Sequence, residues 1–115
     1  MIDINLIIGV NIHVCEDNNE ESIVINKSNL LSALSVQQWY ENDSRLLASA
    51  LVRSLVIAHG FQDGNKRTAA IVGAIVEDYT CSEDEMIDCI LSIAKGELKD
   101  VIEIASILYD YKQET

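Results

Sequence analysis

Apolar residues recur at helical spacing along most of this chain. The clearest stripe predicts a helix that begins at Asp43 or Ser44, residue types favoured at a helix N-cap, and that ends near Ala58. Its apolar positions are three or four residues apart and would form one buried face. They are Leu47, Leu51, Leu55 and Ala58.

Further helices are predicted over residues 28–38, 65–79, 82–96 and 100–111. The second of these is rich in small residues that let a neighbouring helix approach closely, so we expect it to be the central helix. Ser82 and Glu85 form the pattern of a capping box at the start of the next one. The chain contains no proline that would interrupt a helix.

The predicted helix 28–38 would be capped by Ser28 or Asn29. It is expected to bury Leu30, Leu31 and Leu34. Trp39 and Tyr40 follow it, and we expect both rings to pack against the fold rather than to stack on a ligand.

The N-terminal part of the chain fits two patterns. Apolar residues alternate over 2–14 as they do in a strand, yet a helical stripe also fits the same segment. A polar loop over 16–22 then leads to a short β-branched run, 23–25, which favours an extended edge, although a buried apolar connector fits it nearly as well. The chain as a whole is predicted to be all-α.

Residues 59–68, HGFQDGNKRT, are the most informative segment. They lie between two apolar runs, so we expect a loop between two buried helices, which is a rigid mount for a site. Gly60 and Gly64 permit backbone angles that other residues avoid. Asn65 would begin the next helix, whose free amides and positive dipole end attract an anion.

Charged side chains strengthen this predicted anion site. Lys66 and Arg67 are adjacent cations, and the planar guanidinium of Arg67 can grip two phosphate oxygens at once. Asp63 could hold a magnesium ion together with phosphate and water. His59 carries an imidazole, the side-chain type that titrates near neutral pH, and could accept a proton from an attacking hydroxyl.

Each residue also has a purely structural interpretation. Asn65 could merely cap the helix, and Lys66 and Arg67 could lie in solvent. Phe61 could anchor the core with His59 packed beside it. A capped helix requires none of the charged residues, however, and all of them fall in one loop. We therefore favour the functional interpretation.

HGFQDGNKRT resembles the signature of the Fic/Doc family, histidine-x-phenylalanine-x-aspartate or glutamate-glycine or alanine-asparagine-x-arginine. The motif most closely resembles that of the death-on-curing (Doc) branch, in which lysine follows the asparagine. Most other Fic proteins have glycine at that position. Weaker resemblance covers residues 28–34 and 95–108. The resemblance to this family implies an all-α helical bundle with a short β-like flap and a helical N-terminal segment. Gly60 is a mild departure, since a proline or a larger residue is more usual there.

The resemblance implies a role for each matching residue. His59 matches the catalytic base that activates a hydroxyl of a target protein. Asp63 matches the acidic residue that binds magnesium or positions that histidine. Gly64 and Asn65 match the anion-binding turn, and Arg67 matches the arginine that grips nucleotide phosphates.

Lys66 separates this motif from the general Fic pattern. A long cation in place of glycine fills space that AMP-transferring members leave for the nucleotide. In the Doc branch this goes with transfer of phosphate from ATP, with Mg²⁺, to a threonine of translation elongation factor Tu. The resemblance thus implies a toxin with phosphotransferase activity. Two alternatives remain, an AMP or other nucleotidyl transferase and a catalytically silent binding module.

The resemblance also implies partners. A flap that aligns a target peptide by main-chain pairing would consist of Ile23, Val24, Ile25 and Asn26. Many Fic proteins carry an inhibitory helix with serine or threonine four residues before a glutamate that glycine or asparagine follows. Glu41 and Asn42 supply only the second half, since Gln37 occupies the serine position. We therefore expect restraint by a separate antitoxin.

Composition limits the other possibilities. A chain of 115 residues is long enough for one core and too short for two, so we expect a single domain over 1–115. The net charge of -11 should repel nucleic acid and anionic membranes. The sequence shows no membrane-spanning apolar stretch or secretory leader, so we expect a cytoplasmic protein. Cys15, Cys81 and Cys89 lack metal-binding spacing and are expected to be reduced thiols, and His13 is expected to be structural.

Overall fold

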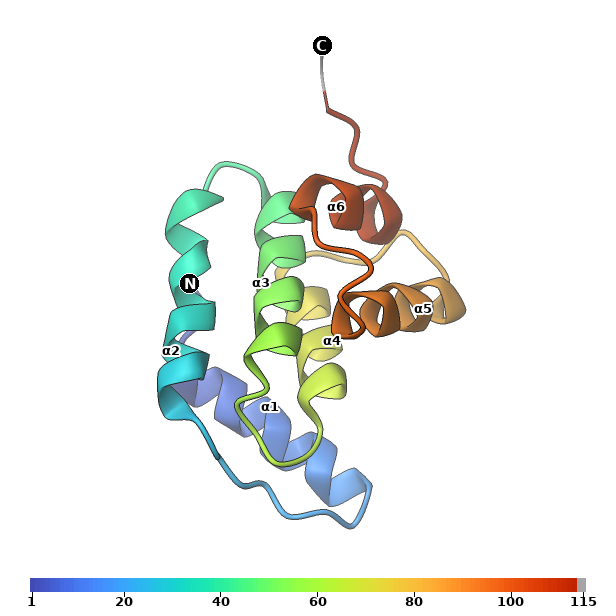
Figure 1. Cartoon of the computed structure of the whole chain (residues 1–115). Helices are drawn as coiled ribbons and strands as arrows, with labels where there is room; N and C mark the ends of the chain where they lie inside the picture. Colours follow the sequence, from blue (N-terminus) through green and yellow to red (C-terminus); the bar gives the residue numbers. More distant parts are fainter. Residues whose placement is uncertain (114–115) are drawn as a thin grey trace.

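The computed structural model describes residues 1–113, which form a bundle of α-helices. This part of the chain contains no strand longer than a single β-bridge, so the prediction of an all-α fold is confirmed. Figure 1 shows the arrangement of the helices. They are α1 (Ile4–Asp17), α2 (Lys27–Leu34), the 3₁₀ helix η1 (Ser35–Trp39), α3 (Ser44–Ala58), α4 (Asn65–Val76), α5 (Glu83–Ala94) and α6 (Val101–Tyr109).

Helix α3 is the centre of the bundle. It contacts α2, η1, α4, α5 and α6, whereas α4 contacts α1, α3 and α5 (Figure 1). The prediction that 65–79 would be the central helix is therefore wrong. The outer face of α4 leaves Ile71 and Ile75 partly exposed, while α3 buries apolar side chains on more than one face. Asp43 caps α3 by accepting the backbone N–H of Arg45 and of Leu46, as predicted.

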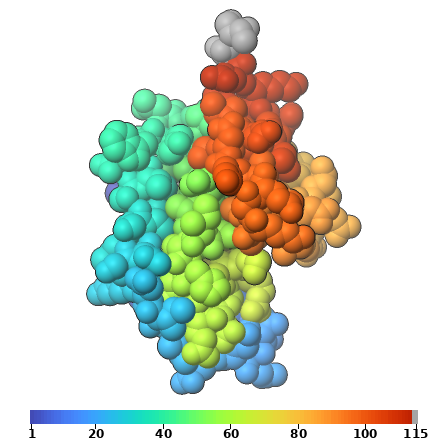
Figure 2. Space-filling view, in the orientation of Figure 1, coloured from blue at the N-terminus to red at the C-terminus, as the bar shows by residue number. Residues whose placement is uncertain are grey.

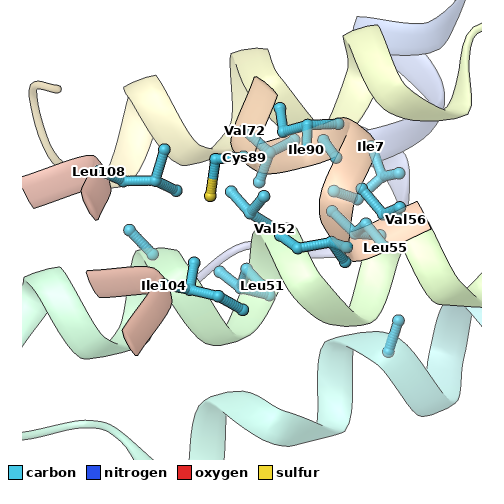
Figure 3. Close-up of a cluster of buried hydrophobic side chains, with 14 of the residues drawn as sticks. Ile7, Leu51, Val52, Leu55, Val56, Val72, Cys89, Ile90, Ile104 and Leu108 are labelled. Carbon is cyan, nitrogen blue, oxygen red and sulfur yellow. The ribbon is translucent and has the colours of Figure 1, made fainter. Parts of the chain in front are cut away.

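The hydrophobic core surrounds α3 (Figure 3). Side chains from α3 meet residues of α1, α4, α5 and α6 there, and the removal of this apolar surface from water stabilises the fold. The labelled residues are Ile7, Leu51, Leu55, Val52, Val56, Val72, Cys89, Ile90, Ile104 and Leu108.

Helix α4 approaches α3 closely at Gly73. A Cβ atom at this position would lie 2.6 Å from Cγ2 of Val52 and 3.0 Å from the hydroxyl oxygen of Tyr109, and would also collide with the hydroxyl of Tyr79. The two tyrosine rings stack with their centroids 5.2 Å apart. The hydroxyl of Tyr79 donates to the backbone oxygen of Ala70 at 2.6 Å. The chain therefore folds back after Val76 so that Tyr79 contacts Ala70, and α4 ends before the predicted residue 79.

The segment predicted as one helix over 28–38 is divided in the structure. Helix α2 begins earlier than predicted, and its cap is Asn26, whose side-chain oxygen accepts the N–H of Asn29 at 2.9 Å. The chain then tightens into η1, which turns Gln37 inward. The amide of Gln37 donates to the backbone oxygen of Ile2 at 2.8 Å and accepts the N–H of Ile2 at 2.9 Å. This pair fixes the start of the chain to η1.

Two side chains that the helical pattern assigns to the interior lie at the surface. Leu31 is 49% exposed and Trp39 is 75% exposed. The prediction that Trp39 packs against the fold is therefore wrong. Only one face of α2 meets the bundle, and the 3₁₀ turn brings Gln37 rather than the indole to the interior.

The other predicted helix boundaries are confirmed or nearly so. Residues 4–17 form a helix, which settles the ambiguity of the N-terminal segment. Ser82 and Glu85 form the predicted capping box, and hydrogen bonds from Ser82 hold the pKa of Glu85 below its usual value. Helix α6 ends at Tyr109 rather than at 111, because Asp110 takes left-handed backbone angles.

Replacement of Gly73 by alanine tests the close contact between α3 and α4. The free energy of unfolding of Gly73→Ala is expected to fall by about 2 kcal/mol, because the added methyl group overpacks the core. Gly9→Ala in α1 is the matched control, since nothing lies within 4 Å of a Cβ there. This control should gain about 0.5 to 1 kcal/mol from helix propensity. Urea unfolding measures both, and an undiminished stability of Gly73→Ala would contradict the contact.

Candidate functional site

The loop over 59–64 joins α3 to α4 and carries the candidate site. His59 ends α3 with left-handed backbone angles (φ 47°, ψ 49°), and Gly64 takes φ 78° and ψ 14° directly before α4. A glycine is needed at 64, because a side chain there would be strained by the positive φ and would meet Asn11 and Val14 at 3.1 Å. The two left-handed residues reverse the chain, so that α4 returns along α3 (Figure 1).

Asn65 fixes the shape of this loop. Its side-chain oxygen accepts the N–H of Phe61 at 3.0 Å, and its amide nitrogen donates to the backbone oxygen of Phe61 at 2.7 Å. The same amide nitrogen lies 3.4 Å from Nδ1 of His59. Gly64 occupies the N-cap position, so the interpretation of Asn65 as a simple helix cap is wrong. Phe61 is buried and anchors the loop in the core.

Asn11 of α1, which was not among the predicted site residues, supports the loop from behind. Its side chain is buried, and its amide donates to the backbone oxygen of Asp63 at 2.9 Å and to the hydroxyl of Thr68 at 3.2 Å. Its oxygen accepts the hydroxyl of Ser22 at 2.6 Å. One amide thus ties together α1, the loop, α4 and the segment before the flap. A polar residue within the buried stripe of Ile7 and Val14 was the signal.

The residues predicted to handle phosphate do come together. A cavity of about 360 Å³ is lined by His59, Asp63, Gly64, Asn65, Lys66 and Arg67, together with Glu20 and Gln62. The side chains of His59, Lys66 and Arg67 are exposed, and that of Asp63 is half-buried. Three of these residues also line a second cavity, of about 510 Å³, between the end of α3 and residues 93–99. They are His59, Asn65 and Lys66.

Arg67 has an acidic partner that the sequence analysis did not assign to the site. Its Nη2 lies 2.6 Å from Oε1 of Glu20, and both side chains are partly exposed. The carboxylate engages one nitrogen of the guanidinium, a donor that an anionic ligand could otherwise use. A partly exposed pair contributes only about 0 to 1 kcal/mol, so a phosphate ligand can displace it.

The carboxylate of Asp63 fits magnesium only in company with a phosphate ligand. It makes no hydrogen bond or ion pair with residues 1–113. The described residues contain no cluster of three or more histidine, cysteine or acidic side chains that would hold a metal by themselves. Magnesium is commonly bound by one or two carboxylates together with substrate phosphates and water, and Asp63 at the edge of the smaller cavity satisfies that description.

The predicted flap runs antiparallel to the loop. The N–H groups of Ile25 and Asn26 donate to the backbone oxygen of Gly60 at 2.9 and 3.1 Å, and the N–H of Gln62 donates to the oxygen of Ile23 at 2.9 Å. The backbone N–H and C=O of Val24 therefore face the opposite side, and neither bonds to another backbone group within residues 1–113.

The exposure of the flap separates the two interpretations of the β-branched run. Val24 is 38% exposed and Ile25 is 55% exposed. The extended edge is confirmed, and the alternative of a buried connector is wrong.

The remaining candidate residues lie outside the site or behind it. Cys15 lies behind the loop with Sγ 3.8 Å from the backbone oxygen of Asp63, and burial raises the pKa of its thiol. Cys15, Cys81 and Cys89 form no disulfide. His13 lies on an exposed part of α1, 3.5 Å from Asp17, and takes no part in the site.

Comparisons of the chain with protein-family models and with curated proteins give no match. None of the helices within residues 1–113 has the length and apolar character needed to cross a bilayer.

Replacement of Asn11 tests the support behind the loop. Asn11→Leu should lower the free energy of unfolding by about 3 kcal/mol, because it leaves the backbone oxygen of Asp63 and two hydroxyl groups without their partner. Asn5→Leu, an exposed position on the same helix, should change it by less than about 0.5 kcal/mol. Chemical unfolding compares the two, and equal effects would mean that the buried amide does not support the loop.

Proposed function

We propose that this chain is a Doc-like member of the Fic/Doc family that transfers phosphate from ATP to a serine or threonine hydroxyl of a target protein. One observation carries the proposal. The imidazole of His59 and the cationic start of α4 line the same cavity, with Nδ1 of His59 3.4 Å from the amide of Asn65. A base for a hydroxyl and a binding site for phosphate would then lie side by side, on a loop that the buried side-chain amides of Asn11 and Asn65 hold in place.

The chemistry requires little beyond position and charge. The hydroxyl of the target gives its proton to His59 while its oxygen bonds to the terminal phosphorus, and the bond from that phosphorus to ADP breaks. Lys66, Arg67 and the free amides of the first turn of α4 stabilise the phosphoryl oxygens. Magnesium held by Asp63 would neutralise part of the phosphate charge.

The flap is suited to present the target. Its inner edge is occupied by the loop, while the N–H and C=O of Val24 face outward without a backbone partner among residues 1–113. An extended target segment could pair with this edge as an added strand, which would bring its hydroxyl to the side of the loop where His59 lies. Ile23, Val24, Ile25 and Asn26 would then position the target without reading its sequence.

In the cell, the activity would be that of a toxin held in check by a separate antitoxin. The support is the absence from the sequence of the complete inhibitory pattern, of which only Glu41 and Asn42 are present. Elongation factor Tu is the target that the resemblance to the Doc branch implies.

Removal of the imidazole tests the transfer reaction. Incubation of the purified chain with ATP, Mg²⁺ and a bacterial lysate should add one phosphate to a target protein, detected by mass spectrometry. His59→Ala should lower the rate about 100- to 10,000-fold, because the general base is lost. His13→Ala is the matched control and should transfer normally. Addition of a nucleotide would favour the nucleotidyl transferase, and absence of any transfer would favour a silent binding module.

The toxin proposal predicts arrest of protein synthesis. Addition of the purified chain to a bacterial translation extract containing ATP should stop translation, and His59→Ala should not. Translation that continues undiminished in the presence of the active chain would contradict the proposed target class.

A further inference from the structure

Helix α5 presents four exposed side chains at intervals of four residues, which we call the α5 ridge. They are Glu83, Ile87, Leu91 and Lys95. Ile87 is 43% exposed and Leu91 is 39% exposed. Side chains four residues apart lie above one another on a helix, and Lys95 at the C-cap keeps helical backbone angles. The α5 ridge therefore consists of an acid, two apolar groups and a base, in that order.

An apolar groove lies beside the α5 ridge. It has a volume of about 360 Å³ and separates the first turns of α4 from α5. Ala70 of α4 and Met86 and Ile90 of α5 supply apolar groups to its walls, together with Ile87 and Leu91. Figure 2 shows the surface hollowed below α5, where α4 lies. Exposed apolar groups that adjoin an apolar groove are typical of a surface that a partner covers.

The charges of α5 are divided between its two ends. The first turn carries Glu83, Asp84 and Glu85, and it lies farther from α3 than the end of the helix does (Figure 1). At the other end, Lys95 and Lys66 of α4 line the same larger cavity, so basic groups gather there. Neither Glu83 nor Lys95 forms an ion pair within residues 1–113. One end of α5 is thus complementary in charge to the other end.

We propose that the α5 ridge and the groove beside it form the interface of a two-fold symmetric dimer of this chain. The two copies of α5 are antiparallel, and each ridge packs into the groove of the other copy. Ile87 of each copy faces Leu91 of the other, and Glu83 of each copy faces Lys95 of the other. One axis satisfies both pairs, because both are centred on position 89. The dimer does not depend on the transfer reaction proposed above.

The order of charges on the α5 ridge identifies the occupant as a second copy. A two-fold interface brings the same patch of both subunits together, so the patch must be complementary to itself. The α5 ridge meets this requirement, since its acid and its base lie at equal distances from its apolar centre. A uniformly basic partner would match Glu83 but would be repelled by Lys95 and Lys66.

The overall charge of the protein restricts where two copies can meet. Two molecules with a net charge of -11 repel each other over most of their surfaces. The α5 ridge carries one acid and one base, and therefore has no net charge of its own. Pairing Glu83 with Lys95 at both ends fixes the register of the two helices and disfavours the parallel arrangement, which would place like charges together.

Sedimentation equilibrium of the full chain tests the dimer. The wild type should dimerise with a Kd of about 10 to 100 µM, which is weak because one helix and one groove make a small interface. Leu91→Glu should weaken the dimer at least about tenfold, because it places a carboxylate in the apolar centre. Circular dichroism shows whether each variant keeps its helices.

The matched control for Leu91→Glu is Ile12→Glu on α1. Ile12 is 42% exposed and lies outside the groove, so this variant should dimerise as the wild type does. A wild type that stays monomeric would leave the groove to a different partner and would overturn the proposal. Equal weakening by the two variants would overturn it as well.

Charge exchange tests the antiparallel pairing without a change in the apolar centre. Glu83→Lys places two lysines opposite each other at both ends of the interface, and Lys95→Glu places two glutamates there. Each variant alone should dimerise about five- to tenfold more weakly than the wild type. An equimolar mixture of the two variants restores an acid opposite a base at both ends, so the mixture should associate about as tightly as the wild type. A mixture that associates no better than its components would contradict the pairing.

Discussion

Asn65 bonds to both main-chain groups of Phe61, and the candidate site depends on this clamp. A loop that carries a base and an anion site cannot hold them in register if its backbone can rearrange. The clamp joins Asn65, the first residue of α4, to Phe61, four residues earlier in the chain. Phe61 is itself buried in the core. Packing therefore fixes Phe61, the amide fixes the loop to Phe61, and the loop fixes His59. Asn11 repeats this device at Asp63 from the other side.

The net charge of the whole protein and the charges that line its larger cavity have opposite signs. The net charge of -11 repels polyanions as a whole, and it acts over a distance comparable to the Debye length, about 8 Å at physiological salt. The cavity of about 510 Å³ is different, because Arg53, Lys66, Lys95 and Lys99 line it without an acidic residue, and none of the four forms an ion pair within residues 1–113. Under the proposed function, this difference would let a compact phosphate compound bind to a protein whose overall charge disfavours long nucleic acids. Glu20 holds the guanidinium of Arg67 in place, and under the proposed function a phosphate oxygen would replace its carboxylate.

The helices could be predicted wherever one apolar face and a cap agreed, as they do in α3 and α5. The prediction failed where backbone geometry changed within an apolar run. Nothing in the residues before Trp39 announces a 3₁₀ turn, and the turn decides that Gln37 and not the indole lies inside. The loop residues of the site could be predicted because they are adjacent in sequence. Arg53, Lys95 and Lys99 could not, because only the crossing of the helices brings them to the loop. Asn11 stood out as a polar residue within a buried apolar stripe, but its contact with Asp63 could not be predicted, because that contact depends on how α1 crosses α4.

The two edges of the flap differ in whether their backbone groups have partners. Gly60 and Gln62 take up the inner edge of the flap, which leaves the N–H and C=O of Val24 for a partner strand. The cationic cavity lies between the end of α3 and the segment after α5. Under the proposed function, an acceptor paired with the flap and a phosphate donor bound at the start of α4 would approach the loop from different elements, with His59 at the edge of the cavity between them. If both substrates bound to the same face of the loop, they would compete for the same surface. Each substrate of the proposed reaction would then have its own surface, and the loop between them would set the distance over which phosphate moves.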